Sequence, residues 1–226
     1  MTERTEPTEP TEPTEPGASL DPRSFDARAA TWDTPQRVAR ASAAAAAIRS
    51  AVKFPPGCRA IEIGAGTGLV GLALLDKLGE LVLADTSEGM LAEARRKIAE
   101  RELRNVRAVR FDLVADPAPD GAPFDAAISQ LVLHHIEDTA AGLAGFKRLL
   151  APGGLLVALD LDSEDGSFHG GVGQGVHHQG FDRARLGRLT EAAGFMDVEV
   201  RDGGTVGGAE MEDVPYPMFL LTARRP

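Results

Sequence analysis

The chain has 226 residues, of which 43% are hydrophobic and 26% are charged, and its formal net charge is -10 at pH 7. A chain of this length can bury enough apolar surface for one α/β domain with a sizeable core. The acidic balance argues against an RNA- or DNA-binding protein, because phosphate contacts normally need a basic face. The single cysteine, Cys58, excludes an internal disulfide framework and a cysteine-rich metal site.

The first residues have a composition of their own. Residues 5–16 are four Thr-Glu-Pro repeats, and Met1 is the only apolar residue before position 17. Ordering each residue costs about 1 to 2 kcal/mol, and this segment has no apolar surface to bury in return. We therefore predict a disordered tail over residues 1–18 and a folded domain over 19–226.

Nothing in the sequence indicates a membrane protein. No apolar run approaches the roughly 18 residues that span a bilayer, and the polar start lacks the basic and apolar regions of a signal peptide. We expect a cytoplasmic protein with neither membrane nor nucleic acid as a partner. The oligomeric state stays open.

The folded part is expected to begin with a helix over 35 to about 52. Asp33 or Thr34 before Pro35 is typical of a helix start, and Pro55-Pro56-Gly57 ends the helix. Alanines form a small-residue face that allows close packing.

Residues 59–73 are predicted to form a short apolar strand, a glycine turn and the start of a helix. Glycines 64, 66 and 68 follow the pattern G-x-G-x-G, whereas the dinucleotide fingerprint G-x-G-x-x-G would need a glycine at Leu69. With Glu62, the run Glu-Ile-Gly-Ala-Gly-Thr-Gly resembles the first motif of class I S-adenosylmethionine-dependent methyltransferases. That resemblance implies cofactor contacts by Glu62, Gly64, Ala65, Gly66 and Thr67. The N-terminal Phe-Asp-x-x-Ala-x-x-Trp-Asp is similar to the family's cap, so Trp32 is expected either to touch ligand or to pack in the core.

An acidic residue ends the second predicted strand, Leu81 to Ala84. Asp85 lies 17 positions after Gly68, where a βαβ nucleotide-binding unit holds a ribose diol. A carboxylate can accept hydrogen bonds from both hydroxyls. The alternative is that Asp85 only caps the helix beginning near Ser87.

The helix that begins near Ser87 is predicted to be amphipathic. Met90, Ala94 and Ile98 lie on its predicted buried face, and Glu93 and Lys97 are expected on its solvent-exposed face. The candidate cofactor residues in this region are Asp85, Thr86 and Met90.

Val106 to Phe111 is predicted as the third strand, followed by Asp112 and Leu113. In the methyltransferase pattern, a side-chain acceptor here takes the adenine amino group, and the next backbone amide meets the ring. The resemblance implies these roles for Asp112 and Leu113. An exposed loop aspartate is the alternative.

Residues 124–135 are predicted as the fourth strand and its exit, which in the family faces the transferred methyl group. Gln130 is the candidate cofactor residue, and His134 and His135 are candidate general bases together with His178. Adjacent strand residues point oppositely, so at most one of the paired histidines is expected in the cleft. Packed or capping histidines are the alternative. The Asp/Asn-Pro-Pro-aromatic motif of adenine and glutamine methylation is absent.

The last third of the chain is predicted to complete an α/β sheet. Asp138 caps a helix that ends at Pro152-Gly153-Gly154, and 155–161 is a strand buried on both faces. Residues 160–180, with Gly166, Gly170, Gly171, Gly173 and Gly175, are expected to form a lid or substrate loop. The spacing of His169, His177 and His178 disfavours a metal site, and none is predicted. A helix over 181–193 and strands over 197–201 and 216–224 follow.

The predicted architecture is a Rossmann-like, doubly wound, mostly parallel sheet of seven strands with an antiparallel last strand. The resemblance covers about 25–226 and implies a methyltransferase that moves a methyl group from S-adenosylmethionine to an O, N, S or C nucleophile of a small molecule. A catalytically silent S-adenosylmethionine-binding module is the first alternative. A nicotinamide-dependent oxidoreductase is the second, although it would need a catalytic Tyr-x-x-x-Lys pair or its equivalent and the only tyrosine, Tyr216, lies in the predicted closing hairpin.

Overall fold

The computed structural model describes residues 24–170, 175–207 and 214–226. The predicted tail and the glycines at 171 and 173 lie outside these ranges. The helices, 3-10 turns included, are α1 (Phe25–Arg28), η1 (Ala29–Thr31), α2 (Pro35–Ala51), α3 (Leu69–Leu74), η2 (Leu75–Lys77), α4 (Glu88–Glu100), η3 (Leu133–His135), α5 (Thr139–Leu149), η4 (Ser167–His169) and α6 (Arg183–Ala192). The strands are β1 (Arg59–Ile63), β2 (Glu80–Asp85), β3 (Val106–Arg110), β4 (Phe124–Gln130), β5 (Leu150–Leu161), β6 (Met196–Gly207) and β7 (Pro215–Arg224).

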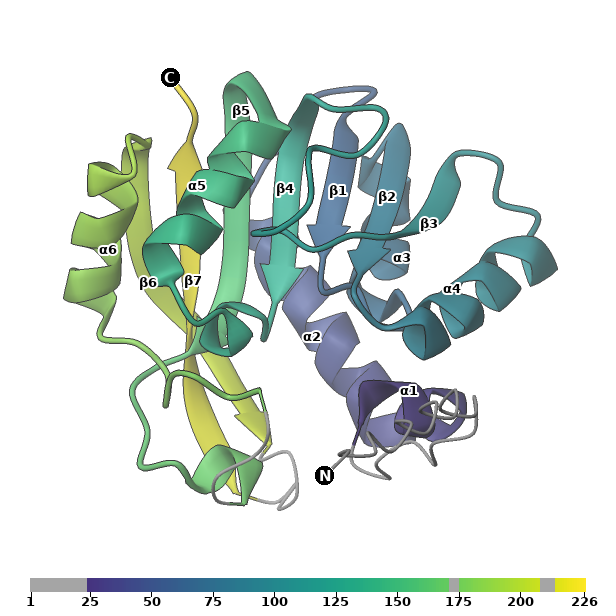
Figure 1. The fold of residues 1–226 in the computed structure, drawn as a ribbon, viewed down its shortest axis with the longest axis horizontal. Helices are drawn as coiled ribbons and strands as arrows, with labels where there is room; N and C mark the ends of the chain where they lie inside the picture. Colours follow the sequence, from purple (N-terminus) through teal and green to yellow (C-terminus); the bar gives the residue numbers. More distant parts are fainter. Residues whose placement is uncertain (1–23, 171–174, 208–213) are drawn as a thin grey trace, which may run out of the picture.

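The strands form one sheet in the order β3-β2-β1-β4-β5-β7-β6 (Figure 1). The pairs from β3 through β5 are parallel, and β7 runs antiparallel to both β5 and β6. The order reverses direction between β1 and β4, where open α/β sheets bind ligands at the carboxyl ends of their strands. The predicted seven-stranded, mostly parallel sheet is confirmed.

Helices cover both faces of the sheet (Figure 1). One core cluster joins the sheet to α2, α3 and α4 through side chains such as Ile48, Leu74 and Ala94. A second cluster joins the opposite face to α5 and α6 through Phe146 and Leu186. The three layers bury most of β1 and β4, which explains their largely apolar sequences.

Local capping explains where the helices begin. Thr34 accepts a hydrogen bond from the backbone N–H of Arg37, Asp138 accepts from two amides at the start of α5, and Asp182 accepts from the third residue of α6. These contacts supply acceptors for N–H groups that have no partner inside the helix. The structure therefore gives the capping role before α2 to Thr34 rather than Asp33.

Several boundaries differ from the sequence prediction. α5 ends at Leu149, before the predicted end at Pro152-Gly153-Gly154, because β5 already begins at Leu150. β5 runs to Leu161, so Asp160 is a buried strand residue and not the first residue of a loop. β6 continues to Gly207, well past the predicted end at 201, because it pairs with β7 along most of that strand. Gly203 and Gly204 suggested a loop between the last two strands, but pairing with β7 keeps this segment in the strand.

Candidate functional site

The glycine turn lies between the end of β1 and α3. Gly64, Gly66 and Gly68 all have positive φ, between 53° and 82°. A Cβ atom at Gly64 would collide with the side chain of Val132 at the β4 exit, so only glycine fits there. The turn therefore exposes backbone at the point where the sheet order reverses.

Glu62 is buried directly beneath this turn. Its Oε2 atom accepts a hydrogen bond of 2.9 Å from the backbone N–H of Gly71, and a side chain at Gly71 would collide with that oxygen. Burial raises the pKa of Glu62 to about 8, although the Gly71 bond opposes the shift and the charge of Asp85 adds to it. Glu62 thus ties α3 to β1 and is mostly protonated at pH 7.

Asp85 joins the glycine turn to the start of α4. One carboxylate oxygen accepts from the backbone N–H of Gly66 at 2.7 Å, and the other accepts from the N–H of Ser87 at 2.9 Å. Burial raises the pKa of Asp85 even though these amides lower it. The helix cap itself is Ser87, whose Oγ accepts from Met90. Each Asp85 oxygen keeps a further lone pair for a hydroxyl.

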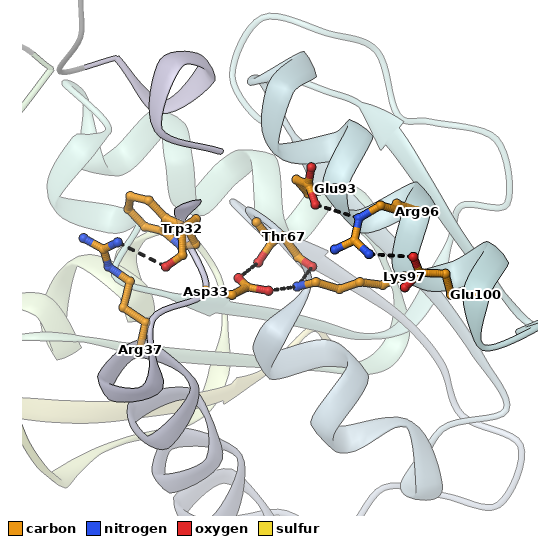
Figure 2. A network of polar contacts seen from close by, with 8 residues as sticks. All are labelled: Trp32, Asp33, Arg37, Thr67, Glu93, Arg96, Lys97 and Glu100. Atoms are coloured by element: carbon orange, nitrogen blue, oxygen red, sulfur yellow. Dashed lines mark hydrogen bonds and ion pairs between the residues drawn. The ribbon is translucent and has the colours of Figure 1, made fainter. Parts of the chain in front are cut away.

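The N-terminal segment lies across this region, as Figure 2 shows. Asp33 accepts a 2.5 Å hydrogen bond from the hydroxyl of Thr67 and pairs with the Lys97 ammonium, which also donates to the Thr67 carbonyl at 2.8 Å. The side chain of Lys97 is only 9% exposed. The predicted solvent-facing position of Lys97 is wrong, because residues 24–34 cover that side of α4.

Further contacts hold the same segment in place. Asp26 accepts hydrogen bonds from Ser87 Oγ at 2.6 Å and from the backbone N–H of Gly89 at 2.7 Å, and these bonds lower its pKa. Trp32 is half-buried, with the Arg37 guanidinium 4.0 Å from its ring centroid. The segment thus binds both the glycine turn and the first turn of α4.

The remaining predicted cofactor residues differ in their surroundings. Asp112 is half-buried, and its Oδ1 accepts from the backbone N–H groups of Val114 and Ala115, so it stabilises its own turn. Leu113 is buried. Thr86 is exposed. Met90 is buried, and its sulfur faces Gly66 of the glycine turn, where it would contact the Cβ of any larger residue.

Gln130 ends β4, next to the glycine turn. Its side-chain Nε2 is buried and has no hydrogen-bond partner among the described residues. Leaving a buried amide donor unpaired costs about 1 to 3 kcal/mol of folding free energy. Gln130 Nε2 is therefore placed to donate a hydrogen bond to a ligand.

The paired histidines are in the 3-10 turn η3, not in a strand. The ring centroids of His134 and His135 are 4.1 Å apart, so the strand alternation behind the prediction of one cleft-facing histidine does not apply here. His169 joins them from η4, with its Nε2 3.1 Å from Nε2 of His134. His178 lies apart, near the carbonyls of Ile136 and Glu137.

The buried carboxylate of Asp160 holds His134 and the backbone just before it in place. One oxygen is 2.6 Å from His134 Nδ1, and the other accepts from the backbone N–H groups of Val132 and Leu133. Burial disfavours its charge, but the charge and hydrogen bond of His134 outweigh that effect and lower the pKa of Asp160. Burial, together with the neighbouring His134, lowers the pKa values of His135 and His169 to about 4. Both rings are neutral at pH 7.

Sequence reasoning missed Asp33, Asp160 and Lys97 as members of the site. The Trp-Asp pair before Pro35 marked Asp33 only as a possible cap. Asp160 ends an apolar run in a buried strand, and a carboxylate at such a position is a recognisable sign of a buried polar network.

Across the described ranges, no helix is long and apolar enough to cross a membrane. Residues 61–156 match a family described as "Methyltransferase domain". A demethylmenaquinone methyltransferase of Thermus thermophilus is 40% identical over 104 residues, which are 45% of this chain and 46% of that relative. The match thus spans less than half the length of the relative.

Solved structures share the fold of the whole domain. A SAM-dependent methyltransferase from Aquifex aeolicus has a TM-score of 0.64 at 19% identity, over 89% of this chain and 98% of its own. Phosphoethanolamine N-methyltransferase 2 of Haemonchus contortus, solved with S-adenosyl-L-methionine, has a TM-score of 0.63 at 18% identity, over 80% of this chain and 52% of its own. Residues 61–156 therefore carry a methyltransferase domain, and the described sheet has the fold of class I S-adenosylmethionine-dependent methyltransferases.

Proposed function

We propose that this protein is an S-adenosylmethionine-dependent methyltransferase that acts on a small-molecule acceptor. The observation that carries the proposal is the meeting of the glycine turn, the Asp85 carboxylate and the unpaired Gln130 amide at the switch point of the sheet. A nucleoside with a ribose diol and a charged amino-acid tail offers the hydroxyl donors and the acceptors that these groups need.

Each residue has a distinct task in this proposal. Asp85 would accept from the ribose hydroxyls, and Asp112 with the Leu113 amide would meet the adenine. Gln130 would donate to an acceptor on the cofactor, and Glu62 would hold α3 in place rather than touch ligand. When bound, the cofactor would supply the electrophilic methyl group.

The protein's contribution to the reaction is then chiefly positioning. Holding the nucleophile in line with the methyl group supplies on the order of 7 to 11 kcal/mol. A hydroxyl acceptor must also lose a proton, and a ring with a pKa of about 4, such as His135, is a weak base for that task. His178 remains the candidate general base that lies outside the histidine cluster.

The acceptor class follows from two further observations. The net charge of -10 argues against nucleic acid. A relative named for methylation of demethylmenaquinone supports a small organic acceptor with a reactive ring carbon or hydroxyl as the first class to test.

Calorimetry with the full chain tests the cofactor. We expect S-adenosylmethionine and its demethylated product to bind and to raise the melting temperature, and NAD to do neither. Micromolar NAD binding without S-adenosylmethionine binding would overturn the proposal in favour of an oxidoreductase.

A screen with methyl-labelled cofactor tests the reaction. Small quinols, phenols and amines should include at least one acceptor that receives label in the presence of the protein. Tight cofactor binding with no transfer to any acceptor would instead support the catalytically silent binding module.

A further inference from the structure

We propose that His134, His135 and His169 form a binding site for a divalent transition-metal ion of the zinc type. Each histidine offers a ring nitrogen, and these three nitrogens lie within 4.8 Å of one another. Two of the ligands come from η3 after β4, and the third comes from η4 after β5. The sequence did not indicate the site because His169 lies 34 and 35 positions after the adjacent pair His135 and His134.

The distances fit coordination of one ion. Imidazole nitrogens bound at about 2.0 to 2.1 Å in a tetrahedral site lie about 3.3 Å apart. The Nε2 atoms of His134 and His169 are 3.1 Å apart, and the ring centroids of His169 lie 5.1 Å from His134 and 5.4 Å from His135. The widest nitrogen pair, within 4.8 Å, must shorten when an ion binds, and His135 and His169 are the two half-buried rings of the cluster.

The surrounding hydrogen bonds select the nitrogen that His134 and His135 each present. Asp160 accepts at Nδ1 of His134, and the Gly175 carbonyl accepts at Nδ1 of His135 at 2.6 Å. Metal-binding histidines almost always donate their other ring N–H to a carboxylate or a backbone carbonyl in this way. Both rings therefore keep the Nε2 lone pair for an ion.

The chemistry of the ligand set decides the class of metal. Three imidazoles favour zinc, copper, nickel, cobalt or iron over magnesium and calcium, which prefer oxygen ligands. The buried carboxylate of Asp160 offsets part of the added positive charge. His135 and His169 are only partly buried, so a fourth position can face solvent or a ligand.

The site adjoins the glycine turn without including it. Val132, two residues before His134, packs against Gly64, and the Phe25 ring of α1 lies 5.9 Å from the His135 ring. An ion there would lie beside the proposed methyl-transfer site. Binding of the ion does not depend on that function.

Titration of the full chain, free of any histidine tag, tests the proposal. Zn²⁺ should bind one to one in competition with a chromophoric chelator, and Co²⁺ should give the visible spectrum of a four- or five-coordinate nitrogen site. His169→Ala and His135→Ala should each weaken Zn²⁺ binding by at least about 10-fold. His177→Ala is the matched control, since His177 is exposed and outside the cluster.

The outcomes separate this proposal from others. Unchanged Zn²⁺ affinity in His169→Ala, or no one-to-one binding by the unaltered chain, would overturn it and leave a hydrogen-bonded histidine cluster. Circular dichroism of each variant shows that a loss of binding is not a loss of folding. S-adenosylmethionine affinity measured on the same variants should stay unchanged, so failure of the metal site is distinct from failure of the methyltransferase proposal.

Discussion

Asp85 is the residue on which the proposed cofactor site depends most directly. Asp85→Ala should weaken S-adenosylmethionine binding by about 1.5 to 3 kcal/mol, because it removes a charged acceptor for the ribose. The same change leaves the N–H groups of Gly66 and Ser87 without their acceptor, so a modest loss of stability should accompany it. Calorimetry and chemical denaturation measure the two effects separately.

Asp112→Ala is the comparison for this variant. Asp112→Ala should also weaken cofactor binding, but less than Asp85→Ala does. If Asp85→Ala bound the cofactor as tightly as the unaltered protein, Asp85 would serve only to connect the glycine turn to α4.

Glu62 should make stability depend on pH. Its folded-state pKa, about 8, lies above the ordinary value of 4.5, so the native protein binds the proton more tightly than the unfolded chain. The resulting stabilisation is fully present below pH 4.5 and is lost as the pH rises through about 8. Its size is on the order of a few kcal/mol.

Glu62→Gln tests this effect, because the amide oxygen can still accept from Gly71 and does not titrate. Urea denaturation at pH 5.5 and pH 8.5 should show a larger fall in unfolding free energy for the unaltered protein than for the variant. Equal falls would mean that Glu62 is ionised in the folded protein at both pH values.

At the scale of elements, α4 holds the N-terminal segment through Lys97. Lys97→Met should remove both bonds of the ammonium and cost about 1 to 3 kcal/mol, while the rest of α4 keeps its packing. Trypsin cleavage at Arg28 or Arg37 should then become faster. Limited proteolysis followed by mass spectrometry measures this.

Arg96→Met is the matched control on the same helix. Arg96 pairs with Glu93 and Glu100 on an exposed face, as Figure 2 shows, and exposed pairs contribute little. Similar cleavage rates in Lys97→Met and the unaltered protein would show that Asp26 and Trp32 suffice to hold the segment.

The elements that local pattern determines were predictable from the sequence. The glycine turn, the Asp138 cap and the buried strands depend on neighbours close in the chain, and their predictions are confirmed. Lys97 was placed wrongly because helical periodicity gives the faces of a helix but not the distant segment that covers one. The histidine cluster was missed because it depends on a 3-10 turn and on Asp160 behind it.

At the scale of the whole molecule, the repeats at the start of the chain should be dispensable for the domain. Deletion of residues 1–16 should leave the melting temperature and the cofactor affinity nearly unchanged, because that sequence offers almost no apolar surface to bury. Thermal denaturation and calorimetry of the two chains compare them. A drop of several degrees would show that the repeats dock on the domain.

The Asp33 contacts with Thr67 and Lys97 have a consequence for kinetics. Because these contacts involve Thr67 of the turn that is proposed to hold the cofactor, we expect exchange of the cofactor to require opening of this segment. Association and dissociation should then be slowed together, which lengthens the residence time of the cofactor without changing its equilibrium affinity. The demethylated product would be retained in the same way, so its release is a candidate for the step that limits turnover.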